Sequence, residues 1–126
     1  MTYHWLSHKK SQSSKKIITL LTAYDATMAR LISQTDTDII LVGDSLGNIF
    51  QGESDTESVT CDHMVYHTKA VRNGAPKHYI IADMPFLTAS ISPDKTVRDA
   101  GKLIQLGRAD AVKIEVISHR QLPMLK

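Results

Sequence analysis

The sequence predicts an α/β fold with a parallel sheet, and three observations support this prediction. Four short segments rich in aliphatic and β-branched residues have the length of buried strands: 17–23, 38–43, 78–83 and 111–115. The segments between them carry apolar residues at helical spacing. The connections have about the length of a strand–helix–strand crossover, which places consecutive strands parallel. Four such strands are half the number in a (β/α)₈ barrel, which typically needs about 250 residues.

The composition describes one ordinary globular domain of 126 residues, with 42% hydrophobic and 22% charged residues. The net charge of +2 comes largely from Lys9–Lys10 and Lys15–Lys16, which stand among serines. A nucleic-acid-binding protein would show a denser basic stripe with interleaved aromatic residues, so we expect no nucleic-acid partner. We expect residues 1–14 to form a short helix and a linker, and residues 15–126 to form the partial barrel.

Two further features of the sequence indicate where in the cell the protein is expected. No apolar run approaches the 18 or so residues of a membrane span, so we expect no contact with a membrane. The sequence has one cysteine, Cys61, which excludes a disulfide within the chain and is typical of a reducing compartment. We therefore expect a cytoplasmic protein.

The first two strands enclose one helix. The β-branched run 17–23 predicts a buried strand. Asp25 then caps a helix, and its expected apolar face consists of Met28, Leu31 and Ile32. The second strand, 38–43, is aliphatic almost throughout, which predicts burial on both faces. It leads into Asp44 and Ser45 at its carboxyl end, where ligands bind in α/β folds.

A long polar loop and a second helix follow. Residues 48–58 predict an irregular loop of the kind that often forms lids or binding loops. Thr60 or Asp62 begins the next helix, and Gly74 ends it. The expected inner face of this helix consists of Met64, Val65 and Val71.

The third helix has the clearest beginning. Ser92–Pro93 combines a capping hydroxyl with a proline in the first turn, and Gly107 ends the helix. Its expected inner face consists of Val97, Ala100 and Ile104. A last helix is expected to begin near Ser118.

Three of the four strands end in an acidic residue: Asp44, Asp83 and Glu115. Because the carboxyl ends of adjacent parallel strands meet at one rim, we expect the three to converge. Carboxylate oxygens suit Mg²⁺, and an acid cluster without a cation would be destabilised by repulsion. Lys113 lies on the same side of its strand as Glu115 and can reach the same ligand. Any one of these acids could equally cap a helix.

Five sequence blocks carry a family resemblance. They are Leu21-Thr22-Ala23-Tyr24-Asp25, Leu41-Val42-Gly43-Asp44-Ser45-Leu46-Gly47, Tyr66-His67-Thr68-Lys69-Ala70-Val71-Arg72, Ala82-Asp83-Met84-Pro85-Phe86 and Ala109-Asp110-Ala111-Val112-Lys113-Ile114-Glu115. In their order and spacing, over roughly residues 15–115, they resemble the ketopantoate hydroxymethyltransferase family. The second, fourth and fifth blocks are highly specific.

The resemblance implies a fold, a reaction and roles for five residues. The fold would be the amino-terminal half of a (β/α)₈ barrel of the phosphoenolpyruvate and isocitrate lyase superfamily. The reaction would be transfer of a one-carbon unit from 5,10-methylenetetrahydrofolate to 3-methyl-2-oxobutanoate, with Mg²⁺, giving ketopantoate. By position, Asp44 and Asp83 would bind Mg²⁺ and the keto acid, Glu115 would contact the metal, Ser45 would hold the keto acid, and Lys113 would neutralise its carboxylate.

The resemblance also marks what is missing. Family chains are about twice this length and carry a catalytic glutamate in their second half, so we expect no catalytic base among these 126 residues. Two alternatives to the transferase therefore stay open. One is a non-catalytic half-barrel that binds the keto acid or pairs its sheet edges with another subunit as a homo-oligomer. The other is a carbon–carbon lyase of the same superfamily.

Three lesser signals have structural explanations. His63 and His67 stand four apart on one helix, a spacing that can chelate Zn²⁺, but a third ligand is not evident and we expect surface or packing roles. Cys61 is expected to be a half-buried thiol rather than a nucleophile. Tyr24, after the first strand, either lines the pocket or simply packs there.

Overall fold

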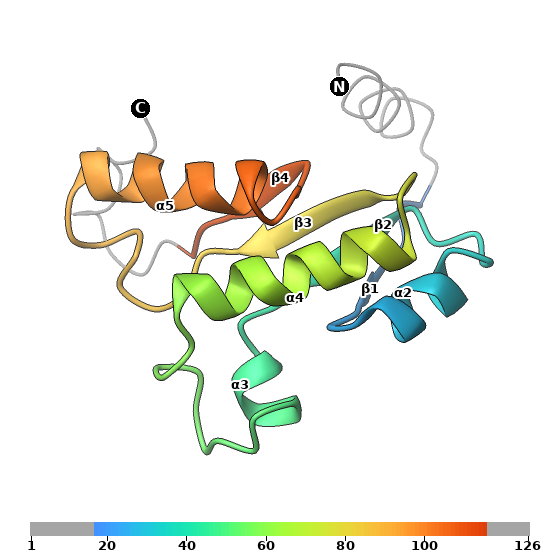
Figure 1. The fold of residues 1–126 in the computed structure, drawn as a ribbon, viewed down its shortest axis with the longest axis horizontal. Helices are drawn as coiled ribbons and strands as arrows, with labels where there is room; N and C mark the ends of the chain where they lie inside the picture. The colour runs from blue at the N-terminus through green and yellow to red at the C-terminus, as the bar shows by residue number, and fades with distance from the viewer. Residues whose placement is uncertain (1–16, 116–126) are drawn as a thin grey trace.

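The computed structural model describes residues 17–115 and contains one parallel sheet of strand order β1-β2-β3-β4 (Figure 1). The strands are β1 (Leu20–Thr22), β2 (Ile39–Val42), β3 (Tyr79–Asp83) and β4 (Ala111–Lys113). The helices are α2 (Ala26–Ile32), α3 (Leu46–Ile49), α4 (Cys61–Gly74) and α5 (Pro93–Gln105). The predicted α/β fold with four parallel strands is confirmed. The predicted helix and linker at 1–14 and the helix near Ser118 lie outside the described residues.

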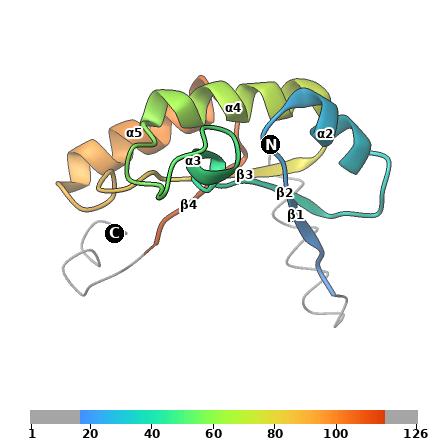
Figure 2. The ribbon, with the colours of Figure 1, turned by 90° about the horizontal axis from the view of Figure 1, so that it is seen from below.

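The helices α2, α4 and α5 cover one face of the sheet (Figure 2). On that face Ile40, Val42, Ile80 and Ala82 are fully buried. Alternate residues of β2 and β3, such as Ile39 and Ile81, point to the other face and stay partly exposed. The predicted burial of 38–43 on both faces is therefore wrong for this chain, because helices lie on one side only. The uncovered face is the one that a closed barrel turns inward.

The strand predicted at 17–23 is shorter and more exposed than expected. Only Leu20–Thr22 pairs with β2, and the side chains of Leu20 and Leu21 are 44% and 49% exposed. The apolar face predicted for α2 is also only partly correct, because Ile32 is buried whereas Met28 and Leu31 are exposed. Both deviations have one cause: β1 is an edge strand of the described sheet, and nothing in residues 17–115 covers its outer side.

Helix α4 begins as predicted and ends for a different reason. Thr60 accepts a hydrogen bond from the backbone N–H of His63, and the His63 ring accepts one from Thr60 N–H in return. Met64 and Val71 are fully buried and Val65 partly so, which confirms the predicted face. Gly74 is the last helical residue and has no left-handed backbone. Its importance is close packing, because a Cβ there would lie 2.2 Å from the carbonyl oxygen of Ala26.

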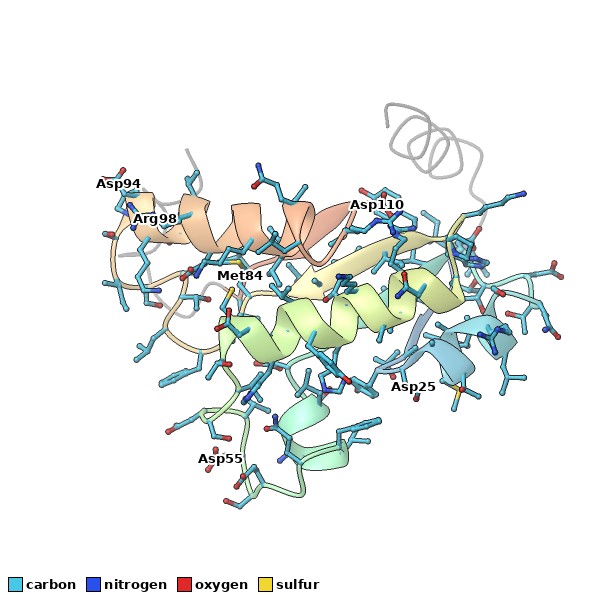
Figure 3. All side chains as sticks on the ribbon, viewed as in Figure 1. Asp25, Asp55, Met84, Asp94, Arg98 and Asp110 are labelled. Carbon is cyan, nitrogen blue, oxygen red and sulfur yellow. The ribbon has the colours of Figure 1, made fainter. Side chains whose placement is uncertain are left out.

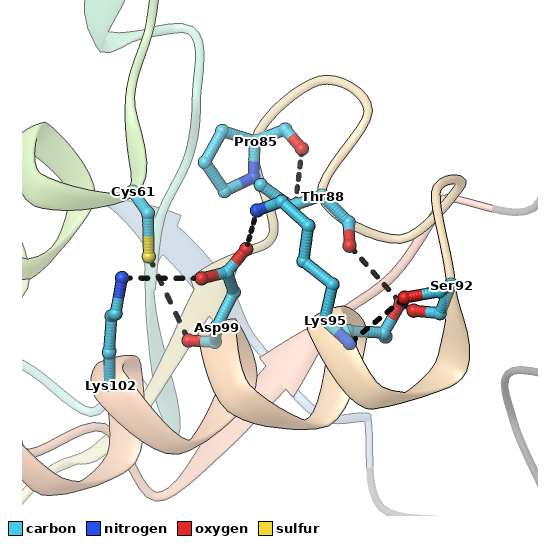
Figure 4. A network of polar contacts seen from close by, with 8 residues as sticks. Cys61, Pro85, Thr88, Ser92, Lys95, Asp99 and Lys102 are labelled. Carbon is cyan, nitrogen blue, oxygen red and sulfur yellow. Dashed lines mark hydrogen bonds and ion pairs between the residues drawn. The ribbon is translucent and has the colours of Figure 1, made fainter.

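Helix α5 is capped by Ser92 as predicted, but its buried face is rotated from the one expected. The fully buried positions are Thr96, Asp99 and Leu103, whereas Ala100 and Ile104 are partly buried and Val97 is 68% exposed. The pattern misled because a carboxylate occupies the inner face. Asp99 is 2% exposed and is neutralised by ion pairs with Lys95 and Lys102 (Figure 4), which makes its burial tolerable.

Cys61 lies beside the same cluster (Figure 4). Its thiol donates a weak hydrogen bond to the backbone oxygen of Asp99 at 3.8 Å. Burial, followed by the nearby Asp99 carboxylate, raises the pKa of the Cys61 thiol. A thiol held in its neutral form is a poor nucleophile, as the prediction of an inert half-buried cysteine requires.

An ion pair between buried Arg72 and partly buried Asp110 stabilises the amino ends of β3 and β4, and we call it the Arg72–Asp110 brace. Arg72, 7% exposed, donates from Nη2 to Asp110 Oδ2 at 2.5 Å and from Nε to the backbone oxygen of Arg108 at 2.9 Å. Asp110 Oδ2 also accepts from Ile80 N–H at 2.8 Å. Figure 3 shows Asp110 at the opposite end of β3 from Met84. The brace therefore stabilises the amino end of the sheet, and the carboxyl ends of the strands take no part in it.

Within residues 17–115, none of the helices has the length and apolar character needed to cross a membrane.

Candidate functional site

The carboxyl ends of β3 and β4 bring three of the predicted site residues together. Asp83 and Lys113 are partners in the parallel register, and Glu115 follows two residues later. The Lys113 ammonium lies 2.8 Å from Asp83 Oδ1 and 3.2 Å from Glu115 Oε1. Asp83 is 5% exposed, so its charge is held in a protein environment with Lys113 as the partner. The prediction that these strand ends converge is confirmed.

Asp44 joins this group from the end of β2. Its backbone N–H donates to Asp83 Oδ2 at 3.3 Å. Burial raises the pKa of the Asp44 carboxyl, and the negative charges of Asp83 and Glu115 raise it further. Lys113 acts in the opposite direction. The pKa of Asp44 therefore depends on the charges of Asp83, Lys113 and Glu115, and the four residues together come from three strand ends.

Gly43 makes room for the polar groups around it. A Cβ at this position would lie 2.8 Å from Ser45 Oγ and 3.5 Å from Asp83 Oδ2. Gly43 is on the uncovered face of the sheet, one step beyond the end of β2. The absence of a side chain lets the Asp83 carboxylate and the Ser45 hydroxyl approach the same stretch of backbone.

Ser45 is paired with a residue whose role the sequence left open. The Ser45 and Tyr24 hydroxyls lie 2.8 Å apart, a hydrogen bond in which either can donate. Tyr24 is 9% exposed and follows β1, the edge strand next to β2, so it approaches Ser45 from the opposite side of β2 to Asp83. The sequence does not predict this contact, because a helix and a strand separate Tyr24 from Ser45 in the chain.

The rim opens into a cavity of about 110 Å³. Its acidic lining residues are Asp44 and Glu115, and the rest come mainly from the segment after β3. The remaining lining residues are Thr56, Met84, Pro85, Phe86, Leu87, Ala89 and Ser90. The cavity combines two carboxylates with an apolar wall, an arrangement suited to a small ligand that carries both a polar and an aliphatic part.

The donors at this rim fit Mg²⁺ through two carboxylates. Asp83 Oδ1 is buried, and among described residues it accepts no hydrogen bond of standard geometry, having only the Lys113 ammonium as counter-charge. Burial and then the charges of Asp83 and Glu115 raise the pKa of Asp44, and a cation bound between the carboxylates would offset their repulsion. In residues 17–115 no three His, Cys, Asp or Glu side chains are arranged to hold a metal ion. Mg²⁺ often uses one or two carboxylates and completes its octahedron with water and substrate, which Asp44 and Asp83 can support.

The two histidines of α4 have separate structural roles. The His63 ring completes the capping box at Thr60. His67 lies with its Nδ1 atom 2.7 Å from the backbone oxygen of Tyr24. The expectation of surface or packing roles for both histidines is confirmed by these contacts.

Solved structures show the same architecture. Two crystal forms of 2,3-dimethylmalate lyase, a member of the PEP mutase/isocitrate lyase superfamily, superpose with TM-scores of 0.68 and 0.66 at 20% sequence identity. The trigonal form covers 98% of this chain and 41% of the lyase chain, and the triclinic form covers 90% and 40%. The four-stranded unit is thus a part of a larger (β/α) barrel fold, as the sequence predicts.

Sequence comparison adds the family. The family model of ketopantoate hydroxymethyltransferase matches residues 1–125. Proteins named 3-methyl-2-oxobutanoate hydroxymethyltransferase are similar to this chain: 49% identical in Leptospira interrogans, 46% in Clostridium beijerinckii and 51% in Pseudothermotoga lettingae. The matches cover 82%, 87% and 84% of this chain but only 39%, 40% and 40% of those relatives, so the chain spans about two fifths of their length. The chain belongs to the ketopantoate hydroxymethyltransferase family.

Proposed function

We propose that this chain provides the metal and keto-acid half of a ketopantoate hydroxymethyltransferase site. The reaction would transfer a one-carbon unit from 5,10-methylenetetrahydrofolate to 3-methyl-2-oxobutanoate in pantothenate biosynthesis. One observation carries the proposal: the buried Asp83 carboxylate pairs at 2.8 Å with the partly exposed Lys113 ammonium, at a rim whose other members are Asp44, Ser45 and Glu115. The rim holds anionic oxygens for a cation and a cation for an anionic substrate, which is the pairing an α-keto acid with a divalent metal requires.

Lys113 is the group that would bind the substrate carboxylate. Burial alone would lower the pKa of its ammonium, but the hydrogen bonds and charges of Asp83 and Glu115 outweigh burial and raise that pKa above its ordinary value. Lys113 therefore stays protonated at neutral pH, where the substrate carboxylate is ionised. A ligand carboxylate beside Lys113 would replace part of the contact with Glu115, which is 69% exposed and able to move away.

Asp44 and Asp83 would hold the metal, and Glu115, which lines the same cavity as Asp44, would contact it through a water molecule. When bound there, Mg²⁺ would polarise the keto carbonyl and make the C3–H of the substrate more acidic. Ser45 would donate a hydrogen bond to the keto acid, and the apolar wall after β3 would accommodate its aliphatic part. The group that removes the C3 proton is expected from the part of the family fold that this chain does not span.

The test is a calorimetric titration of the 126-residue chain with 3-methyl-2-oxobutanoate in MgCl₂. We expect saturable binding that depends on Mg²⁺, weakened about tenfold by Lys113→Met because a charge-assisted contact is lost. Asp94→Asn, at an exposed acidic residue of α5, is the matched control and should bind as the unmodified chain does (Figure 3). An unmodified chain that binds the keto acid equally well without Mg²⁺, or not at all, would contradict the proposal.

A second function, the non-catalytic half-barrel, is favoured by the edges of the sheet. In the described part of the chain β1 and β4 each pair with a single neighbour, and the inner face carries partly exposed apolar residues such as Ile39 and Ile81. We propose that two copies close an eight-stranded barrel, β4 of each pairing with β1 of the other, which gives a homo-oligomer without open edges.

Light scattering on the purified chain tests this closure. A closed pair has twice the 14.0 kDa mass of one chain, whereas a lone half-barrel has that mass alone. A dimer that binds the keto acid but forms no ketopantoate with the folate donor would favour the non-catalytic role, and turnover would exclude it. The likeness to 2,3-dimethylmalate lyase, at 20% identity, supports a shared fold and not lyase chemistry.

A further inference from the structure

We propose that Tyr24 is a positioning residue that aims the Ser45 hydroxyl at the bound keto acid. The inference rests on the proposed function, since it names how one of the binding groups is oriented. Its basis is the 2.8 Å contact between Tyr24 Oη and Ser45 Oγ, which joins the loop after β1 to the loop after β2.

Ser45 does not make the capping hydrogen bond that is usual for a serine at the start of a helix. It is the N-cap residue of α3, where a serine side chain commonly accepts from a backbone N–H of the first turn. Here its side chain makes no capping hydrogen bond, and its backbone has helical rather than extended dihedral angles. The hydroxyl faces Tyr24 instead, so the local sequence alone does not explain its orientation.

Tyr24 is held firmly enough to orient a neighbour. Its side chain is 9% exposed and belongs to the hydrophobic core. Its backbone oxygen lies 2.7 Å from His67 Nδ1 on α4, which fixes the main chain. The ring of Phe50 lies against both Tyr24 and His67, with centroid distances of 6.4 and 5.1 Å. The tyrosine hydroxyl is therefore placed by three elements of the fold.

The direction of the hydrogen bond follows from the chemistry of the ligand. A keto acid offers only acceptor oxygens, so Ser45 must donate its single proton to bind one. The Ser45 oxygen then needs a donor for its own lone pairs, and the Tyr24 O–H supplies it. A donated hydrogen bond from Tyr24 also polarises the Ser45 hydroxyl and strengthens the bond that it gives.

Gly43 leaves room for this arrangement. The hypothetical Cβ at position 43 would come within 2.8 Å of Ser45 Oγ, closer than real contacts permit. A side chain there would push the hydroxyl away from Tyr24. Both the glycine at position 43 and the hydroxyl of Tyr24 therefore bear on where the Ser45 hydroxyl can lie.

The experiment is a double-mutant cycle on binding of 3-methyl-2-oxobutanoate in MgCl₂, measured by calorimetry. Tyr24→Phe keeps the ring and removes the hydroxyl, and we expect it to weaken keto-acid binding five- to tenfold. Ser45→Ala should weaken binding by at least as much. Combined with Ser45→Ala, Tyr24→Phe should have almost no further effect, because its hydroxyl would act only through Ser45. Tyr66→Phe, at a tyrosine on α4 that is 72% exposed, is the matched control.

A merely structural tyrosine gives a different pattern. It would lower the unfolding midpoint and affect binding independently of Ser45, so that the two fold-changes multiply. That result, or binding by Tyr24→Phe as tight as that of the unmodified chain, would overturn the proposal while the proposed function stands. An unmodified chain that fails to bind the keto acid would overturn both.

Discussion

Asp83 and Lys113 are register partners on adjacent parallel strands, and their side chains meet on the uncovered face of the sheet at 2.8 Å. Neighbouring residues of parallel strands point to the same side, so this pairing follows from the alignment of β3 with β4. Slipping the register by one residue would turn one of the two toward the helices. The strand alignment that forms the sheet therefore also builds the centre of the proposed site.

The raised pKa of Asp44 predicts an unusual dependence of stability on pH. The pKa is raised by burial and by the charges of Asp83 and Glu115, so the folded chain favours the protonated form more than the unfolded chain does. The stability that Asp44 contributes is then complete below the ordinary carboxyl pKa, about 3.9, and is lost as pH rises through the raised value. Without Mg²⁺, Asp44→Asn should be more stable than the unmodified chain at pH 7, by less than about 1 kcal/mol for a half-exposed group.

Urea unfolding at pH 7 and pH 3.5 measures this difference. The advantage of Asp44→Asn should vanish at the lower pH, where the unmodified Asp44 is protonated as well. Adding MgCl₂ at pH 7 should stabilise the unmodified chain and leave the variant nearly unchanged. A variant that is less stable than the unmodified chain at pH 7 would show that Asp44 is not under electrostatic strain.

Two glycines in helices should respond oppositely to alanine. At Gly74 the new Cβ would meet the Ala26 carbonyl oxygen at 2.2 Å, and backbone cannot move aside without separating α2 from α4. We expect Gly74→Ala to destabilise by about 1–3 kcal/mol. At Gly101, in the interior of α5, nothing lies within 4 Å of the added atom. Gly101→Ala should stabilise by roughly 0.5–1 kcal/mol, and equal effects of the two substitutions in thermal unfolding would refute the packing explanation.

The sequence predicted the rim of the site better than the faces of the elements. The four parallel strands, the beginnings of α4 and α5 and the convergence of Asp83, Lys113 and Glu115 follow from local patterns and from the geometry of parallel sheets. The predicted burial of β1 and of Val97 was wrong, because exposure depends on which other elements cover a strand or helix, and local sequence patterns do not encode that. The contact between Tyr24 and Ser45 could not be predicted from the sequence for a similar reason, because it depends on how two loops approach each other in space.

Removing one member of the Arg72–Asp110 brace should unfold the amino end of the sheet. Arg72→Met leaves the Asp110 carboxylate with only the Ile80 N–H among its described partners in this brace, and removes donors to the Arg108 and His78 oxygens. Breaking a buried pair from one side typically costs about 3–5 kcal/mol. Arg98→Met, on the exposed side of α5 (Figure 3), should stay within about 0.5 kcal/mol of the unmodified chain. Denaturant midpoints compare the two, and similar losses for both would mean that the brace is unimportant.

The central claim is that Asp83 serves a metal ion and a keto acid at one site, and Asp83→Asn tests it most directly. Asparagine keeps the size of the side chain and removes its charge. Calorimetry of the 126-residue chain with MgCl₂, and then with 3-methyl-2-oxobutanoate, should show both affinities falling about tenfold or more, while Asp94→Asn leaves both unchanged. An Asp83→Asn chain that is folded and binds Mg²⁺ and the keto acid as tightly as the unmodified chain would contradict the account.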